Sequence, residues 1–411
     1  MAPKAKAKAS QHPTRLASME EAGGLSASAS SFRSSIAKSY KDIDILKNYN
    51  RPYQQLEHVA NPYSSSERYI GGVLDVARYA LCKDERDKIF GILSIAEPLA
   101  DWIRPDYTKS TAQIYTELSV QSLRTRTLWL FEHTHLSISR DDAPTWVPDW
   151  AAINDIQNLS TWSRSSGRSA AVVERLSEGI LRVGGVFVSE VEKSCAIQLD
   201  GSLSGQWTQA CKTLSDLLPS VESLMSQESA QHNSSDEFGR VFSQGRFSEA
   251  FEPPDPDATT FAEFSNFFSK VRNDQDIYWT SYDSIGQFEC ISTVAHDRSL
   301  FHTSTRKVGI GPHGVLPGDI VCVFLGGRSA FILRRHATTA YFQRVGTCFV
   351  NGSMYGEALL GPLPPGWEQF NRRTTGYDVP AYRRTASRGI WQYEDPRLPV
   401  PAPGTTRHDP E

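Results

Sequence analysis

Three glycines in the stretch GIGPHG, at residues 309–314, match the spacing G-x-G-x-x-G of a dinucleotide-binding loop. In such a loop the glycines follow a strand and open a helix, because the pyrophosphate binds at the positive end of that helix. Here Pro317 comes three residues after the last glycine, and the apolar run IVCVFL then predicts a strand. The acidic residue expected about 20 residues after the glycines is absent, and that region holds Arg334 and Arg335. We therefore interpret these glycines as turn residues before a β-hairpin and expect no nucleotide cofactor.

Two histidines and two nearby carboxylates are the residues that could bind a metal ion: His133, His135, Asp141 and Asp142. Their spacing fits a strand or a loop, and no further ligand cluster accompanies them, so we expect no metal site. Glu357 in SMYGEAL is of a type that serves as a general acid. No second carboxylate or histidine is fixed near it by a motif, so we favour a capping or turn role.

Patterns of well-known catalytic sites are absent from the sequence, which has no G-x-S-x-G, H-E-x-x-H, Walker A or zinc-finger pattern. The sequence therefore predicts no catalytic, cofactor-binding or metal-binding residue, and a protein that is not an enzyme. A catalytic group assembled from distant residues stays open, and a small hydrolase or an NAD(P)-linked enzyme is the alternative interpretation. A generic protein-interaction scaffold is a further alternative.

The run IVCVFL after the glycines predicts a strand with two apolar faces. Val321 and Val323 share one face, together with Leu325, while Cys322 and Phe324 share the other. Such a strand is typical of a central position, covered on both sides. The next two residues, Gly-Gly at 326–327, predict a two-residue hairpin turn before a returning strand, AFILRR.

Composition and charge narrow the class of protein. The 411 residues are 39% hydrophobic and 22% charged, with a formal net charge of -4, too small to indicate nucleic acid or a membrane surface as partner. No apolar run approaches the roughly 18 residues of a membrane span. The N-terminus is basic but has no apolar segment of a secretory signal, and the six cysteines form no C-x-x-C pair. Reduced thiols in a cytoplasmic protein fit best, with the nucleus left open.

Hydrophobic spacing predicts an α+β fold: a helical N-terminal segment followed by a β-rich, partly barrel-like unit with a helical insertion. Helices are expected at 64–82, after Asp84, from Ser110 and at 206–218, whereas the polar stretch 227–257 is expected to be a long flexible loop. The expected divisions are a disordered basic and Ser-rich tail (1–63), the helical segment (64–165), the β-rich unit (166–360) with its insertion (about 201–285), and a Pro-rich tail (361–411).

Three further blocks carry polar and aromatic side chains that could position a partner. DERDKIFGILSIA holds Arg86 and Asp87, RPDYTKSTAQIY holds Asp106 and Tyr107, and PTWVPDW holds Trp146, Asp149 and Trp150. We favour structural roles for the first and third blocks, with Asp87 stabilising a helix N-terminus, Arg86 bridging to an acid, and the tryptophans wedging a loop into the core. A partner-binding pair and an exposed aromatic anchor are the alternatives.

Two consecutive stretches of this chain resemble the C-terminal segment of fungal heterokaryon-incompatibility (HET) domain proteins. They are GIGPHGVLPGDIVCVFLGGRSAFILRR and the following YFQRVGTCFVNGSMYGEAL. The resemblance runs through Gly318, Asp319, Gly346, Val350, Gly352, Met354, Gly356 and Glu357. The three upstream blocks are similar to blocks that lie in the same order in these proteins, so that the resemblance covers about 69–360.

The resemblance implies a role in self/non-self recognition. In the family these blocks follow an N-terminal α/β domain of roughly 150 residues, which resembles Toll/interleukin-receptor domains and is held to trigger cell death. The S-Y-x-W-G block of that domain does not occur in this sequence. We therefore expect an intracellular, non-enzymatic accessory or regulatory module that binds other proteins and lacks the cell-death domain. Nucleic acid, membranes and metals are not expected as partners.

Overall fold

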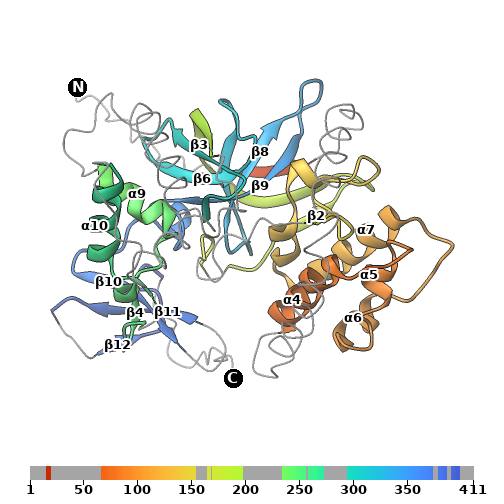
Figure 1. Cartoon of the computed structure of the whole chain (residues 1–411), viewed down its shortest axis with the longest axis horizontal. Coiled ribbons are helices and arrows are strands. Elements are labelled where there is room, and N and C mark those ends of the chain that lie inside the picture. The colour runs from red at the N-terminus through yellow and green to blue at the C-terminus, as the bar shows by residue number, and fades with distance from the viewer. Residues whose placement is uncertain are drawn as a thin grey trace, which may run out of the picture.

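The structure is a computed structural model, and it describes residues 15–19, 66–153, 164–167, 169–197, 234–255, 258–272, 294–373, 378–386 and 390–398. The helix expected at 206–218 and most of the expected N-terminal tail lie outside the described residues. Figure 1 shows a central β-barrel with the helices α4–α7 on one side and a second lobe of helices and strands on the other.

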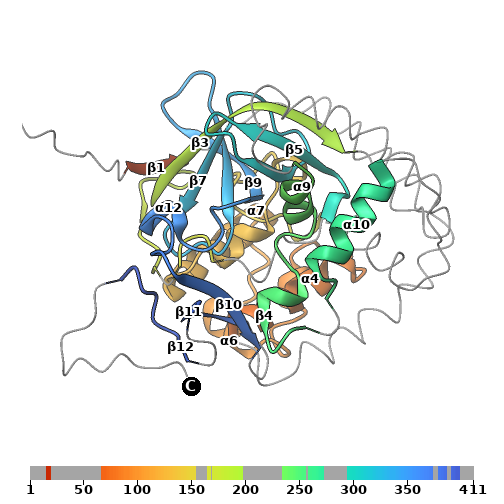
Figure 2. The same ribbon diagram turned by 90° about the vertical axis from the view of Figure 1, so that its left-hand side faces the viewer.

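Six antiparallel strands close into the barrel, in the order β3–β5–β6–β9–β8–β7 and back to β3. Their bounds are β3 (Leu181–Ile197), β5 (Arg298–Thr303), β6 (Val308–Pro312), β7 (Ile320–Phe324), β8 (Ala330–Arg335) and β9 (Phe342–Val350). The long, curved strand β3 closes the barrel, because its first half pairs with β7 and its second half with β5 (Figure 2). Register shifts in both pairings mark the irregularities through which a strand can bend. The expected α+β class with a barrel-like unit is confirmed.

Strand β7 is a wall shared by two hydrophobic cores. All five of its residues are buried. Val321 and Val323 point into the barrel core, while Cys322 and Phe324 belong to the core of the helical segment. The two-faced strand expected from the sequence is therefore confirmed, since one face is covered by the barrel interior and the other by helices.

The connection from β7 to β8 is longer than expected. The strands end and begin at Phe324 and Ala330, so five residues, 325–329, separate them, and the two-residue turn is wrong. Gly326 has a positive φ of 78° and Gly327 does not. The loop is held from outside, because the carbonyl of Gly327 accepts a hydrogen bond from the hydroxyl of Ser166 at 2.7 Å. Ser166 and Gly327 are 161 residues apart in the sequence, so no local pattern could predict this contact.

The helical segment packs on the outer face of strand β7, opposite the barrel core. It contains α4 (Ser66–Tyr79), α5 (Asp87–Phe90), α6 (Glu97–Trp102) and α7 (Thr111–Ser122), followed by the short turns η1 (Leu123–Thr125), η2 (Trp129–His133) and η3 (Leu136–Ile138). The capping box expected at Ser110 and Gln113 is present at the start of α7. The helix expected after Asp84 is short, because α5 ends at Phe90. Pro98 lies in the first turn of the next helix, α6, a position where its missing N–H costs no hydrogen bond.

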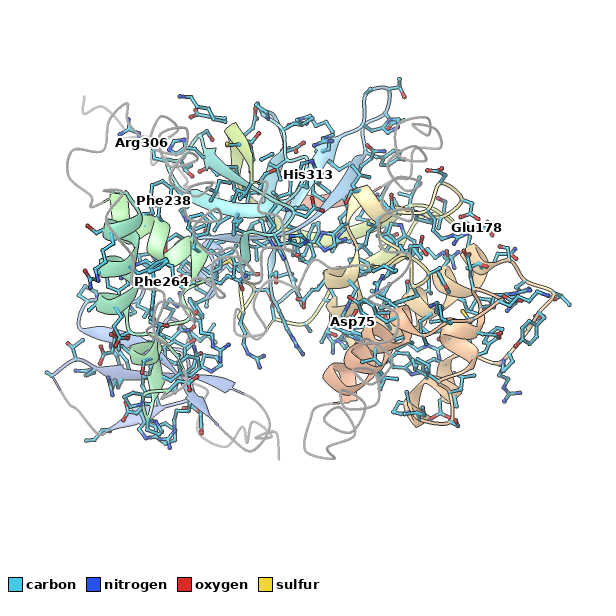
Figure 3. The ribbon with its side chains drawn as sticks, in the orientation of Figure 1. Asp75, Glu178, Phe238, Phe264, Arg306 and His313 are labelled. Carbon is cyan, nitrogen blue, oxygen red and sulfur yellow. The ribbon has the colours of Figure 1, made fainter. Side chains whose placement is uncertain are left out.

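A second lobe contradicts two expectations from composition. The polar stretch expected as a loop contains α9 (Ser234–Phe242), and the Pro-rich tail contains β10 (Trp367–Arg373), β11 (Asp378–Arg384) and β12 (Trp391–Gln392). The apolar side chains of α9 pack against α10 (Phe261–Arg272) and the barrel, as Phe238 and Phe264 illustrate (Figure 3). The three strands form a sheet with β4 (Phe251–Glu252).

Short elements complete the fold. They are β1 (Arg15–Met19) and β2 (Val173–Arg175), which both pair with β3, the turn η5 (Ser248–Ala250), and α12 (Glu357–Leu360). The strand β1 lies within the tail that the sequence predicts to be disordered. Within the part of the chain that the structure describes, no helix is long and apolar enough to cross a membrane.

Candidate functional site

Two of the sequence blocks meet in a polar cluster at the start of α5, which we call the Arg86 cluster (Asp84, Arg86, Asp87, Asp106 and Tyr107). The guanidinium of Arg86 pairs with the carboxylate of Asp84 at 2.6 Å and donates to the carbonyl of Tyr107 at 2.7 Å. The hydroxyl of Tyr107 donates to Asp87 at 2.6 Å, and Arg86 lies 5.1 Å from the Tyr107 ring. The blocks DERDKIF and RPDY are thus joined by side chains that are adjacent only in the fold.

The Arg86 cluster faces solvent. Tyr107 is 56% exposed, whereas Arg86 and Asp87 are half-buried beneath it. Hydrogen bonds from Arg86 lower the pKa of Asp84 to about 2, and the hydrogen bond to Asp87 raises the pKa of the Tyr107 hydroxyl. Asp106 accepts from the backbone and the hydroxyl of Thr108, which lowers its pKa and shapes the turn before α7. The cluster therefore exposes the ring of Tyr107, which is held in place by contacts with the charged side chains of Arg86 and Asp87.

The PTWVPDW block is inside the core. Trp146 and Trp150 are both fully buried, and Asp149 is 4% exposed. The indole N–H of Trp146 donates to the carbonyl of Gly179 at 3.0 Å, which ties the block to the turn after β2. The geometry matches a loop wedged into the core, and these side chains are out of reach of a partner in this conformation.

A buried polar network that the sequence analysis missed surrounds Trp150. The guanidinium of Arg78, on α4, lies 4.4 Å from the Trp150 ring and donates to the carbonyls of Asp149 and His133, at 2.6 and 3.2 Å. His133 is hydrogen-bonded to Asp75 at 2.9 Å, also on α4. Burial lowers the pKa of Arg78, and Asp75 opposes that shift. The local signal in the sequence was the pair of opposite charges on α4, Asp75 and Arg78, which lie three residues apart.

The expected lack of a metal site stays a prediction. His133 faces Asp75 and not His135, so the structure does not gather the histidines and carboxylates that the sequence offered as ligands. In the described ranges no group of three or more His, Cys, Asp or Glu side chains could hold a metal ion.

The Gly318-Asp319 pair closes the turn between β6 and β7. Gly318 has a φ of 89°, which favours glycine. The buried carboxylate of Asp319 pairs with Arg334 on β8 through two contacts of 2.8 Å, and it accepts from the backbone N–H of Leu316. Arg334 also donates to the carbonyl of Gly314 at 2.7 Å. These residues have a structural role in the described fold.

The block around Glu357 is a capped turn. Gly352 and Gly356 have φ angles of 70° and 84°. The carboxylate of Glu357 accepts from the backbone N–H of Tyr355 at 2.6 Å, in agreement with the expected turn role. Arg397, from the C-terminal segment, donates to the carbonyl of Tyr355 at 2.8 Å and pairs with Asp395. The C-terminal segment, which was expected to be a Pro-rich tail, is therefore hydrogen-bonded to the block around Glu357.

The GIGPHG stretch is a strand followed by a turn. Gly309 and Gly311 lie within β6, and only Gly314, with a φ of 85°, lies in the turn that follows. A Cβ on Gly309 would lie 2.4 Å from the Phe301 ring. Two of the three glycines are thus explained by close packing, which corrects the expectation that all are turn residues. The element after the turn is β7, and not the helix that a pyrophosphate site requires.

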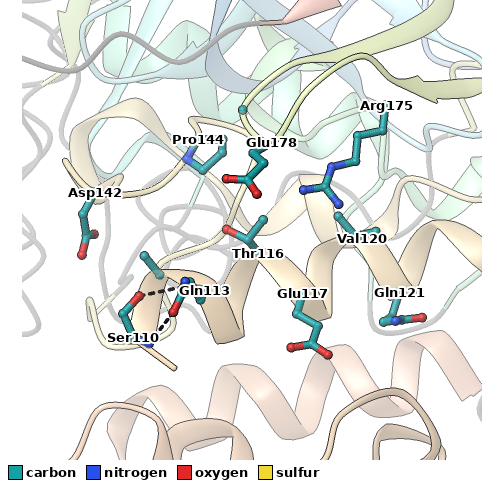
Figure 4. A pocket seen from close by; sticks show the side chains of 12 residues that line it. Ser110, Gln113, Thr116, Glu117, Val120, Gln121, Asp142, Pro144, Arg175 and Glu178 are labelled. Atoms are coloured by element: carbon teal, nitrogen blue, oxygen red, sulfur yellow. Dashed lines mark hydrogen bonds between the residues drawn. The ribbon is translucent and has the colours of Figure 1, made fainter. Parts of the chain in front are cut away.

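A groove of about 540 Å³ lies between α7 and the turn after β2 (Figure 4). Glu178 and Arg175 face Thr116 and Val120 of α7 across it. Glu117, at its rim, pairs with Lys109 at 2.7 Å. The groove is lined by both polar and apolar side chains, has charges of both signs, and adjoins the segment that leads to the Arg86 cluster.

Comparison with known proteins relates the barrel to a fungal family. Residues 246–361 match the family model of the Het-6 beta-barrel domain, a domain found in fungal heterokaryon incompatibility proteins. The matched range holds five barrel strands, β5–β9, but not β3, and it does not include the Arg86 cluster or the PTWVPDW block. No curated protein and no solved structure matches the chain.

Proposed function

We propose that this chain is a non-enzymatic accessory or regulatory module of a heterokaryon-incompatibility-type protein, and that it acts by binding another protein. The observation that carries the proposal is the Het-6 beta-barrel match at 246–361, which coincides with most of a closed barrel. A role in fungal self/non-self recognition follows from the proteins in which this domain is found. We further propose that it acts inside the cell, in the cytoplasm or the nucleus.

The interior of the barrel supports binding by an outer surface. Phe301, Ile310, Val323, Ile332 and Phe349 fill it and are 3% exposed or less. Small barrels filled in this way have no room for a ligand in the lumen. Recognition would then use side chains outside the barrel.

The Arg86 cluster is the surface that we propose for recognition. It combines an exposed tyrosine with an arginine and three carboxylates, and tyrosine and arginine are enriched in the parts of interfaces that dominate binding energy. The Tyr107 hydroxyl donates to Asp87, and the Tyr107 carbonyl accepts from Arg86. These hydrogen bonds hold the region around Tyr107 in place, so little conformational freedom is lost on binding.

The proposal is tested by the outcome of cell fusion. Two fungal strains that are compatible except at this locus are fused, with the gene intact, deleted, or replaced by a Tyr107→Ala variant, and viable fusion cells are counted. Deletion should change the viable fraction, and the variant should behave like the deletion while the protein level stays normal. Equal viability in all three pairings would contradict the proposal.

A further inference from the structure

The barrel and the helical segment contact each other through buried polar residues on and beside strand β9. We call this group the joint (Thr134, His135, Thr145, Arg344 and Thr347). Arg344 is 0% exposed, and its guanidinium donates to the carbonyl of Thr134 at 2.6 Å. The backbone N–H of Arg344 donates to the hydroxyl of Thr145. The next residue after Thr134, His135, is 1% exposed and lies against Gly346, since a Cβ there would be 2.9 Å from its Nδ1. Gly346 pairs with Ile332 of the barrel core, so His135 lies on the barrel side of β9.

Several polar atoms of this joint have no hydrogen-bond partner in the described part of the chain. They are Nε and Nη2 of Arg344, both ring nitrogens of His135, and the hydroxyl of Thr347. Arg344 and Thr347 face the same side of β9, because they pair with Leu333 and Phe331, and both of those belong to the core of the helical segment. Buried groups are very rarely left unpaired, so a species other than the chain is expected to satisfy them.

Chemistry and charge indicate what that species is. A guanidinium has only donors, and a threonine hydroxyl can donate, so the missing partner must accept hydrogen bonds. The carboxylate that acts on Arg344 is Glu132, whose Oε1 accepts instead from the backbone N–H groups of Arg328 and Ser329, at 3.1 and 3.3 Å. A water molecule would accept hydrogen bonds but would not balance the buried positive charge, whereas an anion does both.

We propose that Arg344 and Thr347 form an internal site for a small inorganic anion of about the size of chloride, which fastens the helical segment to the barrel. The near-complete burial of Arg344 and Thr347 excludes a bulky ligand. The binding would be stabilising, because it supplies a counter-ion to a guanidinium that the fold has removed from water.

The test measures the melting temperature of the full chain at constant ionic strength, with glucuronate as the only anion at the start. Glucuronate is then replaced stepwise by chloride, bromide, acetate or phosphate. Chloride and bromide should raise the melting temperature along a saturating curve that yields an apparent Kd. A response to acetate or phosphate alone would overturn the proposed size of the anion. A rise without saturation, following the general salting-out order, would overturn the site itself.

Two conservative variants separate a site from a general salt effect. Thr347→Val keeps the volume and removes the hydroxyl, and it should raise the apparent Kd for chloride about tenfold, as expected for one hydrogen bond to a charged group. The matched control is Thr303→Val, because the Thr303 hydroxyl is also buried but already hydrogen-bonds the carbonyl of Lys307. Its chloride response should equal that of the parent chain, and equal responses in both variants would contradict the proposal.

A measurement on the unmodified chain does not depend on whether variants fold. Crystals grown in bromide should show an anomalous peak within hydrogen-bonding distance of Arg344 Nη2 and of the Thr347 hydroxyl. Density without an anomalous signal at that place would mean water, and the proposal would be wrong.

Discussion

The guanidinium of Arg334 on β8 holds the carboxylate of Asp319 through two contacts of 2.8 Å, and this pair joins the turn before β7 to the strand after it. Asp319 is 2% exposed, while the side chain of Arg334 is 27% exposed. The contact explains why a G-D pair and a strand ending in L-R occur together in the sequence, about fifteen residues apart.

Asp319→Asn should destabilise the protein, since it removes the charge from one partner of a mostly buried ion pair. We expect a loss of about 2–4 kcal/mol in the free energy of unfolding, measured by chemical denaturation. The matched control is Glu174→Gln, which breaks the exposed pair with Arg182 and should cost about 0.5 kcal/mol or less. Equal losses in the two variants would mean that the buried pair contributes nothing of its own.

Gly309→Ala should cost more than Gly314→Ala. A Cβ at Gly309 overlaps the Phe301 ring inside the barrel, and such overpacking costs about 2–3 kcal/mol. A Cβ at Gly314 meets nothing within 4 Å, so only the positive φ is penalised, by about 1 kcal/mol. Denaturation midpoints decide the order, and the reverse order would place the packing constraint in the turn instead of the strand.

The variants Trp150→Ala and Tyr107→Ala should differ in stability, because Trp150 lies in the buried PTWVPDW block and Tyr107 in the exposed Arg86 cluster. The fully buried Trp150 packs against Arg78, and its truncation should cost about 3–5 kcal/mol. Tyr107 is 56% exposed, and its truncation should cost about 1 kcal/mol or less. If thermal unfolding shows Tyr107→Ala to be the more damaging, the Arg86 cluster is a structural element and not a binding surface.

Acid should destabilise the protein through His135. Burial, then the charges of Arg298, Arg344, Arg78 and His133, hold the pKa of His135 well below its usual value. The folded state therefore keeps His135 neutral while the unfolded state takes up a proton below pH ~6.5. Its contribution is fully present above that pH and is lost as the pH falls, at about 1.4 kcal/mol per pH unit.

The measurement for His135 is the free energy of unfolding between pH 7 and pH 5, with glucuronate as the only anion. His135→Gln should reduce the slope of that curve by the equivalent of one proton. An unchanged slope would show that His135 titrates normally in the folded protein.

Expression of the 411-residue chain alone should leave the growth of a fungal host normal, as expected for a regulatory module. An intact heterokaryon-incompatibility protein, expressed in parallel from the same promoter, should arrest growth. Growth rate and dye exclusion give the comparison at matched protein levels. Arrest by this chain would reveal an effector activity in the helical segment or the barrel.

Predictions from the sequence were most accurate where the residues of one short segment determine its local structure. The alternation along β7 placed Val323 and Cys322 on opposite covered faces, and the Ser110–Gln113 capping box marked the start of α7. Composition misled the interpretation of the C-terminal strands, because Pro380 lies within β11 and tertiary pairing outweighed its low strand propensity. Arg344 was missed because a single charged residue in a strand has no motif, and its partners come from segments about 200 residues away.

The closure of the barrel by β3 has a practical consequence for fragments of this chain. A fragment cut to residues 246–361 would contain β5–β9 but would lose the strand that joins β5 to β7. Both strands would then have unpaired backbone N–H and C=O groups, and the apolar barrel interior would be open to solvent. Such edges pair readily with other chains, so a fragment of this kind should aggregate. A soluble fragment of the barrel needs to begin before Leu181.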